Sequence, residues 1–172
     1  MLKGQKVVLR EKRLEDATKD YAWKRDAELA TLDATIPLDI PFSLYLSSYA
    51  EELCYADTRG RRFAIETLDG KHIGNCTYYN LDEHKGEAEL GILIGDRSYW
   101  NRGYGTDAVI TLVNHIFGEI KLKRVYLHTL EYNVRAKECF QKCGFTPCGQ
   151  ANRGDKLFTV MDIKRVDCKG AD

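Results

Sequence analysis

The chain has 172 residues, of which 26 are lysine or arginine and 26 are aspartate or glutamate, so its formal net charge is zero. This length indicates a single domain over residues 1–172, and the balanced charge argues against nucleic acid as a partner, because a nucleic-acid surface normally carries a basic excess. There is no apolar stretch long enough for a membrane span or a signal peptide, so we expect a cytoplasmic protein with no membrane partner.

The first third of the chain predicts one strand and two helices. Residues 6–10 read as a strand, and residues 14–26 read as a helix because apolar side chains recur on one side. Two prolines make residues 31–41 a loop. Ser43 then suits the N-cap of a second helix that runs to about Ala56.

From residue 62 the hydrophobic period becomes that of strands. Residues 62–68, 71–81 and 87–94 are rich in β-branched and aromatic residues, and turn residues separate them. Three strands so close in sequence predict an antiparallel meander.

The last third alternates between helices and strands. We expect helices at 103–117 and 133–143, the second ended by Gly144, and strands at 124–130, 145–149 and 156–165. The complete order predicts a mixed sheet with helices packed on it.

The segment from Ile94 to Thr106 carries the strongest functional signal. A strand ends, a loop follows, and Gly103-Tyr104-Gly105-Thr106 opens an amphipathic helix. Glycines allow a ligand to approach the backbone, and the unpaired N–H groups of a first helical turn attract phosphate. Arg102 adds a positive charge. The pattern therefore predicts a site for a diphosphate-bearing cofactor.

A dinucleotide-binding turn is the alternative, because Gly103-x-Gly105-x-x-Ala108 also matches its fingerprint. That fingerprint requires a strand that runs directly into the first glycine, but eight residues separate Ile94 from Gly103 here. It also requires an acidic residue about 20 positions later, where this chain reads Lys-Leu-Lys-Arg-Val. Both departures make this alternative weak.

Two blocks resemble the Gcn5-related N-acetyltransferase (GNAT) family. Tyr99-Trp100-x-x-Gly103-Tyr104-Gly105-Thr106 resembles its motif A, with Trp100 where glutamine or arginine is usual, and the form is similar to ribosomal-protein N-terminal acetyltransferases. The second block, Asn133-x-Arg135-Ala136-x-x-x-Phe140-x-Lys142-x-Gly144-Phe145, follows at the family's spacing. The resemblance implies an α+β fold with a splayed, mostly antiparallel sheet of about seven strands and about four helices.

The resemblance also implies acetyl-CoA as cosubstrate and transfer of its acetyl group to a primary amine, such as a protein N-terminus, polyamine, amino acid or aminoglycoside. The family allows a homodimer. The positions that match the family's cofactor-binding residues are Leu93, Ile94, Gly95, Asn101, Arg102, Gly103, Tyr104, Gly105, Thr106 and Asn133.

Glu89 and His128 are the two candidates for the base that deprotonates the amine. Glu89 lies fourteen residues before Gly103, where histone-type family members carry a glutamate, and His128 lies five residues before Asn133. A buried carboxylate needs a partner or a function, and a histidine titrates near neutrality. Either residue has a structural alternative, as an ion-paired carboxylate or a packed histidine.

Phe140 departs from the family, because many members carry there a tyrosine that protonates the departing thiolate. Water could replace that tyrosine, or another hydroxyl group, of which Tyr132 and Tyr126 are the nearest in sequence. The alternative function is a non-catalytic acyl-CoA sensor.

The cysteines show no zinc-ligand spacing, so we expect no metal. We expect acceptor specificity to reside in residues 31–43, 79–86 and the last strands.

Overall fold

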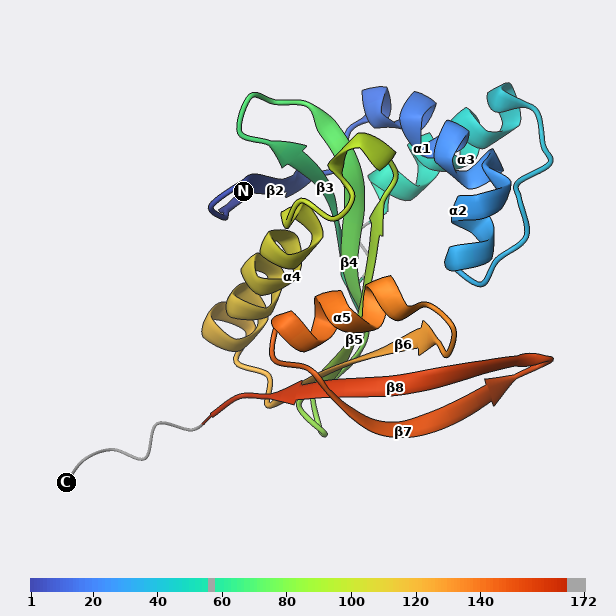
Figure 1. Cartoon of the computed structure of the whole chain (residues 1–172). Coiled ribbons are helices and arrows are strands. Elements are labelled where there is room, and N and C mark those ends of the chain that lie inside the picture. Colours follow the sequence, from blue (N-terminus) through green and yellow to red (C-terminus); the bar gives the residue numbers. More distant parts are fainter. Residues whose placement is uncertain (56–57, 167–172) are drawn as a thin grey trace.

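Within residues 1–55 and 58–166, which the computed structural model describes, eight strands form one sheet in the order β1-β2-β3-β4-β5-β6-β8-β7 (Figure 1). All neighbours are antiparallel except β5 and β6, which are parallel and joined through a helix. The strands are β1 (Leu2–Lys3), β2 (Val7–Glu11), β3 (Arg61–Thr67), β4 (His72–Asp82), β5 (Glu87–Ile94), β6 (Arg124–Leu130), β7 (Thr146–Arg153) and β8 (Lys156–Lys164).

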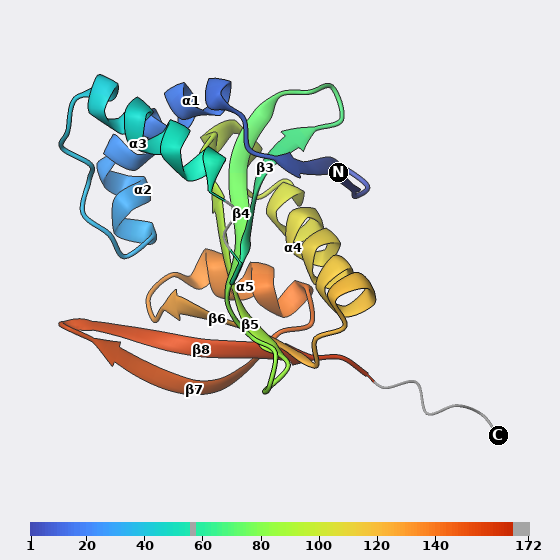
Figure 2. The ribbon, with the colours of Figure 1, turned by 180° about the vertical axis from the view of Figure 1, so that it is seen from behind.

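In the same described residues, five α-helices accompany the sheet, on two sides of it. Helices α1 to α3 lie on one side of the central strands and α4 on the other, as both views show (Figures 1 and 2). The helices are α1 (Ala17–Arg25), α2 (Ala27–Leu32), α3 (Phe42–Cys54), α4 (Tyr104–His115) and α5 (Val134–Lys142).

The two faces of β5 carry different residues. Ala88 and Leu90 are buried in the main hydrophobic core, together with the apolar residues of α4, and Ile92 and Ile94 pack against that core. The predicted alternation of β5 therefore places Glu89 on the opposite face. Packing of the apolar row against α4 fixes the register of the strand, since a slip by one residue would turn the face that carries Glu89 toward α4 instead.

Strands β5 and β6 separate soon after they meet. They pair only over residues 87–89 and 124–126, although β5 continues to Ile94 and β6 to Leu130. Beyond the pairing, β5 stays bonded to β4 and β6 to β8. The sheet thus splits into two halves that diverge (Figure 1), as the family resemblance implied.

Several element boundaries differ from the sequence prediction. The predicted helix at 14–26 is a 3₁₀ turn at Leu14–Asp16 followed by α1. Helix α2 begins immediately afterwards at Ala27, so only its last two residues fall in the predicted loop at 31–41. Helix α3 starts at Phe42, with Pro41 rather than Ser43 at its N-cap, and ends at Cys54; the predicted end at Ala56 lies outside the described residues. Strand β7 is longer than predicted because it pairs with β8 along its whole length.

A buried ionic network anchors the start of α1 to the sheet. Arg10 on β2 donates two hydrogen bonds, of 2.8 and 2.7 Å, to the carboxylate of Asp16, and a third, of 2.5 Å, to Glu66 on β3. Nearby, Lys12 forms a 2.6 Å ion pair with Asp20. All of these charges are paired, as buried charges must be.

Candidate active site

A cavity of about 680 Å³ opens where β5 and β6 diverge. One end is formed by the last residues of α2, the middle by β5 and α5, and the far end by the start of α4. Its lining includes Leu29, Leu32, Asp33, Ile92, Leu93, Ile94, Trp100, Asn101, Gly103, Gly105, Thr106, Asn133, Arg135, Cys139 and Phe140. A long, thin ligand therefore has space from the helical face to the first turn of α4.

The end of the cavity at α4 has the properties of a phosphate site. Gly103 occupies the N-cap with φ of 82°, a left-handed conformation that favours glycine, and α4 then runs away from the cavity. Gly105 and Thr106 line this end, and the ammonium of Lys6 lies beside it, bonded to the carbonyl of Arg102 at 2.9 Å. The helix dipole and a lysine thus favour an anion here.

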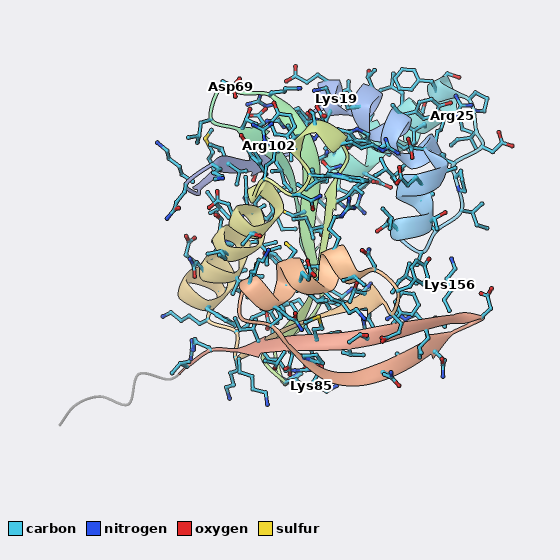
Figure 3. All side chains as sticks on the ribbon, viewed as in Figure 1. Lys19, Arg25, Asp69, Lys85, Arg102 and Lys156 are labelled. Atoms are coloured by element: carbon cyan, nitrogen blue, oxygen red, sulfur yellow. The ribbon has the colours of Figure 1, made fainter. Side chains whose placement is uncertain are left out.

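The predicted cofactor residues divide into two groups. Leu93, Ile94, Asn101, Gly103, Gly105, Thr106 and Asn133 line the cavity. Gly95, Arg102 and Tyr104 are not among its lining residues. Arg102 donates to the carbonyl of Ser98 at 3.1 Å, beside the rings of Tyr99 and Tyr104, near the start of α4 (Figure 3).

Trp100 and Arg135 are site residues that the sequence analysis did not single out. The indole N–H of Trp100 donates to the carbonyl of Ile94 at 2.7 Å, and the guanidinium of Arg135 stacks 3.4 Å from the centre of the indole ring. In this conformation the Ile94 carbonyl is therefore already bonded. The signal for the pair was Trp100 itself, which replaces the family's usual polar residue.

Gly95 serves packing in this structure. A Cβ atom at this position would lie 2.1 Å from the indole ring of Trp23, far inside contact distance. We expect Gly95→Ala to lower the free energy of unfolding by about 1–3 kcal/mol, the usual effect of overpacking. Urea denaturation tests this, and Gly105→Ala is the matched control, because its Cβ would meet only ordinary contacts of 3.6 and 3.7 Å. Equal stability of the two variants would contradict the packing role.

The two predicted base candidates contact each other. Nδ1 of His128 lies 2.7 Å from Oε1 of Glu89, across the point where the strands separate. Glu89 is only 3% exposed, whereas 15% of the His128 side chain is exposed. An ionised carboxylate only accepts hydrogen bonds, so the contact places the proton on Nδ1 and makes Nε2 the ring acceptor, 3.3 Å from a terminal nitrogen of Arg153.

A β-bulge and two tyrosines complete the surroundings of Glu89. The β4–β5 register shifts between Tyr79 and Asp82, where Asn80 has φ of 52° and donates to Oε2 of Glu89 at 3.1 Å. Burial, followed by the nearby Glu89 carboxylate, raises the pKa of Tyr79 and that of Tyr126 above the usual range. Both phenols therefore stay protonated as neutral walls of the site.

Phe140 and Cys139 face the cavity from α5. Phe140 supplies no proton, and Tyr132, one of the predicted substitutes, is largely exposed. Cys139 lies 3.5 Å from the hydroxyl of Thr106, and hydrogen bonds from the Cys143 thiol and from Thr106 lower its pKa to about 6. The cavity thus holds a thiol at its phosphate end and no tyrosine in the place of Phe140.

Residues 6–146 match the family described as the acetyltransferase (GNAT) domain. The chain belongs to the GNAT family. It is an acetyl-CoA-dependent N-acetyltransferase, which transfers an acetyl group to a primary amine. The lining of the cavity fits coenzyme A, since the start of α4 favours an anion at one end and residues of β5 and α5 line the space that continues from it.

Curated relatives of this acetyltransferase include enzymes named for the acetylation of polyamines. It is 27% identical over 136 residues to the spermine/spermidine N(1)-acetyltransferase of Bacillus subtilis, covering 73% of this chain and 90% of the relative. It is 24% identical over 113 residues to the spermidine N(1)-acetyltransferase of Vibrio cholerae, covering 64% of each chain. The closer likeness to ribosomal-protein N-terminal acetyltransferases gains no support from these relatives.

Solved structures show the same fold. The Vibrio cholerae spermidine N-acetyltransferase in complex with CoA and spermine superposes with a TM-score of 0.81 at 19% identity, covering 92% of this chain and 95% of that one. An aminoglycoside acetyltransferase in complex with coenzyme A and kanamycin gives 0.75 at 21% identity, with coverage of 92% and 95%. The predicted fold class is thereby confirmed.

Two features are absent from the described residues. No helix there is long and apolar enough to cross a membrane. In the same part of the chain, no group of three or more His, Cys, Asp or Glu side chains is arranged to hold a metal ion.

Proposed function

We propose that His128 is the base of this acetyltransferase and that Glu89 positions it. The observation that carries the proposal is the 2.7 Å contact between Nδ1 of His128 and the buried Glu89 carboxylate. A buried carboxylate that holds an imidazole in one tautomer, with the second nitrogen directed outward, is an arrangement that other enzymes use for proton transfer. Glu89 itself is too buried to meet the amine directly.

In the proposed reaction the neutral amine attacks the thioester carbonyl of acetyl-CoA directly. A C–N bond forms, the tetrahedral intermediate collapses, and the C–S bond breaks to release the thiolate of coenzyme A. Nε2 of His128 takes the proton that the amine nitrogen loses. Because free thiols have a pKa near 8.5, the thiolate leaves without an acid, which agrees with Phe140 in place of a tyrosine.

The competing route is a covalent acetyl-enzyme, for which Cys139 is the candidate because its pKa is lowered to about 6. Its sulfur lies beside Thr106, at the phosphate end of the cavity, and therefore far from the thioester end. We expect Cys139→Ala to retain kcat within about twofold, since it removes no reacting group. Isolation of an enzyme acetylated on Cys139 during turnover would contradict direct attack.

The acceptor enters, in this proposal, from the side of α1 to α3. The cavity is bounded there by Leu29, Leu32 and Asp33, and Lys156 at the β7–β8 hairpin donates to the Ala34 carbonyl at 3.0 Å, so the hairpin reaches the loop after α2 (Figure 3). Acceptors that the family and the relatives suggest are polyamines, aminoglycosides, amino acids and ribosomal-protein N-termini. A cytoplasmic location, a homodimer, and no role for nucleic acid or membrane remain parts of this proposal.

The experiment is an acceptor screen with the purified protein. Acetyl-CoA is mixed with each amine of a panel from the four classes, and released thiol and acetylated amine are both measured. Equal amounts of thiol and product are expected for at least one class. Binding of coenzyme A without transfer to any amine would overturn the proposed dyad chemistry.

A further inference from the structure

The guanidinium of Arg153 covers the Glu89–His128 dyad. It comes from the end of β7, immediately before the turn at Gly154. One terminal nitrogen lies 3.2 Å from Nδ1 and 3.3 Å from Nε2 of His128, and 3.9 Å from Oε1 of Glu89. The guanidinium carbon is 5.5 Å from the centre of the Phe158 ring. One terminal nitrogen of Arg153 is therefore close to both ring nitrogens of His128.

Nδ1 of His128 already gives its proton to Glu89, so of the two ring nitrogens only Nε2 can accept from this terminal nitrogen of Arg153. Within the described part of the chain, Nε and the other terminal nitrogen of Arg153 have no hydrogen-bond partner. The Glu89 oxygen at 3.9 Å is beyond hydrogen-bond distance. With 55% of its side chain exposed, Arg153 directs its donors at the solvent beside the base.

The other positive groups near the dyad are committed elsewhere. Arg124 bonds Glu87 and Asp162, each at 2.7 Å, so these three charges satisfy one another. Lys156 is bonded to a backbone carbonyl. Arg153 is therefore the cation that an incoming acceptor meets beside Nε2.

We infer that Arg153 selects acceptors that carry an anionic group next to the amine, which makes α-amino carboxylates the substrate class. This rests on the proposed base. A guanidinium binds a carboxylate through two parallel hydrogen bonds. A terminal nitrogen of Arg153 lies 3.3 Å from Nε2 of His128. An acceptor whose amine meets Nε2 while its carboxylate meets Arg153 therefore has the carboxylate only one or two carbons from the amine. The same charge repels a second ammonium, so polyamines are disfavoured.

The test compares amino acids with their own primary amides. The wild-type enzyme and Arg153→Met, which keeps the contact with Phe158 but removes the charge, are assayed with a panel of amino acids, the matching amides, and spermidine. For each pair the ratio of kcat/KM, acid over amide, is measured. The acid-to-amide ratio of the wild type is then divided by the acid-to-amide ratio of the variant, so that intrinsic differences in amine basicity cancel.

We expect Arg153→Met to lower the acid-to-amide ratio of kcat/KM at least tenfold, mainly by raising KM for the acid, while kcat/KM for the amide changes much less. Arg153→Lys should recover only part of the ratio, because an ammonium lacks the paired donors. Arg62→Met, which removes an equally exposed charge paired with Glu52 on the surface, should leave the ratio unchanged.

Two results would overturn the inference. One is an unchanged acid-to-amide ratio in Arg153→Met. The other is a wild-type enzyme that prefers spermidine to every amino acid, with kcat/KM for spermidine rising in the variant, since Arg153 would then only shield the dyad. In both cases amine acetylation continues, so the proposed base stands. The proposal that His128 is the base would be contradicted by a different result, normal turnover in His128→Ala.

Discussion

His128→Ala is expected to lower kcat by about 10²–10⁴-fold for any accepted amine, the usual contribution of a general base. Nε2 of His128 is the atom that receives the amine proton, and water is a poor replacement in a site walled by Glu89, Tyr79 and Phe158. Binding of coenzyme A should be unchanged, because His128 is not among the residues that line the cofactor cavity. Steady-state kinetics and calorimetric titration measure the two effects.

Chemical rescue separates a base from a merely structural histidine. Added imidazole should restore part of the activity of His128→Ala, since it can occupy the vacated space and accept the proton. Glu89→Gln should reduce kcat less than His128→Ala and should not respond to imidazole, because it disturbs only the positioning of the ring. His84→Ala, at an exposed turn, is the matched control and should match the wild type. If His128→Ala had the activity of the wild type, as His84→Ala should, His128 would have no role in the mechanism.

Asp16→Ala is expected to lower the free energy of unfolding by about 3–5 kcal/mol, the largest stability effect that we predict. The variant leaves the Arg10 guanidinium, 5% exposed, buried with Glu66 as its remaining carboxylate partner and the carbonyl of Glu11 at 2.9 Å. It also removes the acceptor of the Arg13 backbone N–H, 2.8 Å from Asp16. Because this network joins α1 to β2 and β3, we expect the whole domain to lose stability, measured by urea denaturation.

The same network predicts a dependence of stability on pH. Burial would raise the pKa of Asp16, but hydrogen bonds from Arg10 and the Arg13 backbone outweigh it and hold the pKa at about 2. In the unfolded chain an aspartate has a pKa near 3.9. The contribution of Asp16 is therefore complete above about pH 4 and is lost as the pH falls toward 2, and Asp16→Ala should lack this part of the acid-induced loss.

Two controls test whether the effect comes from the buried pair. Glu15→Ala removes an exposed carboxylate that pairs with Arg13 at 3.3 Å, and should cost less than about 1 kcal/mol. In a cycle with Arg10→Met, the double variant should lose clearly less stability than the sum of the two single variants. Additive losses would mean that the pair contributes no coupling.

The cofactor end of the site was predictable because its determinants are local. The strand at 87–94, the glycines at 103 and 105 and the amphipathic helix after them follow one another directly in the sequence, and hydrophobic period and helix-start chemistry act over such short distances. The same holds for Asn133, which caps α5 through a bond to the backbone of Ala136 at 3.2 Å. The packing role of Gly95 could not be predicted in the same way, since the side chain that leaves no room for a Cβ there is Trp23, far away in sequence.

By itself, then, the sequence determined the order of the elements, the family, the turn at α4 and two separate candidates for the base. Only the tertiary structure decided that Glu89 and His128, 39 residues apart, form one unit, and that Arg153 lies over them. The physical reason is that these contacts depend on where β5 and β6 diverge and on how the β7–β8 hairpin crosses them. No local periodicity encodes that arrangement, because packing between distant segments alone sets it.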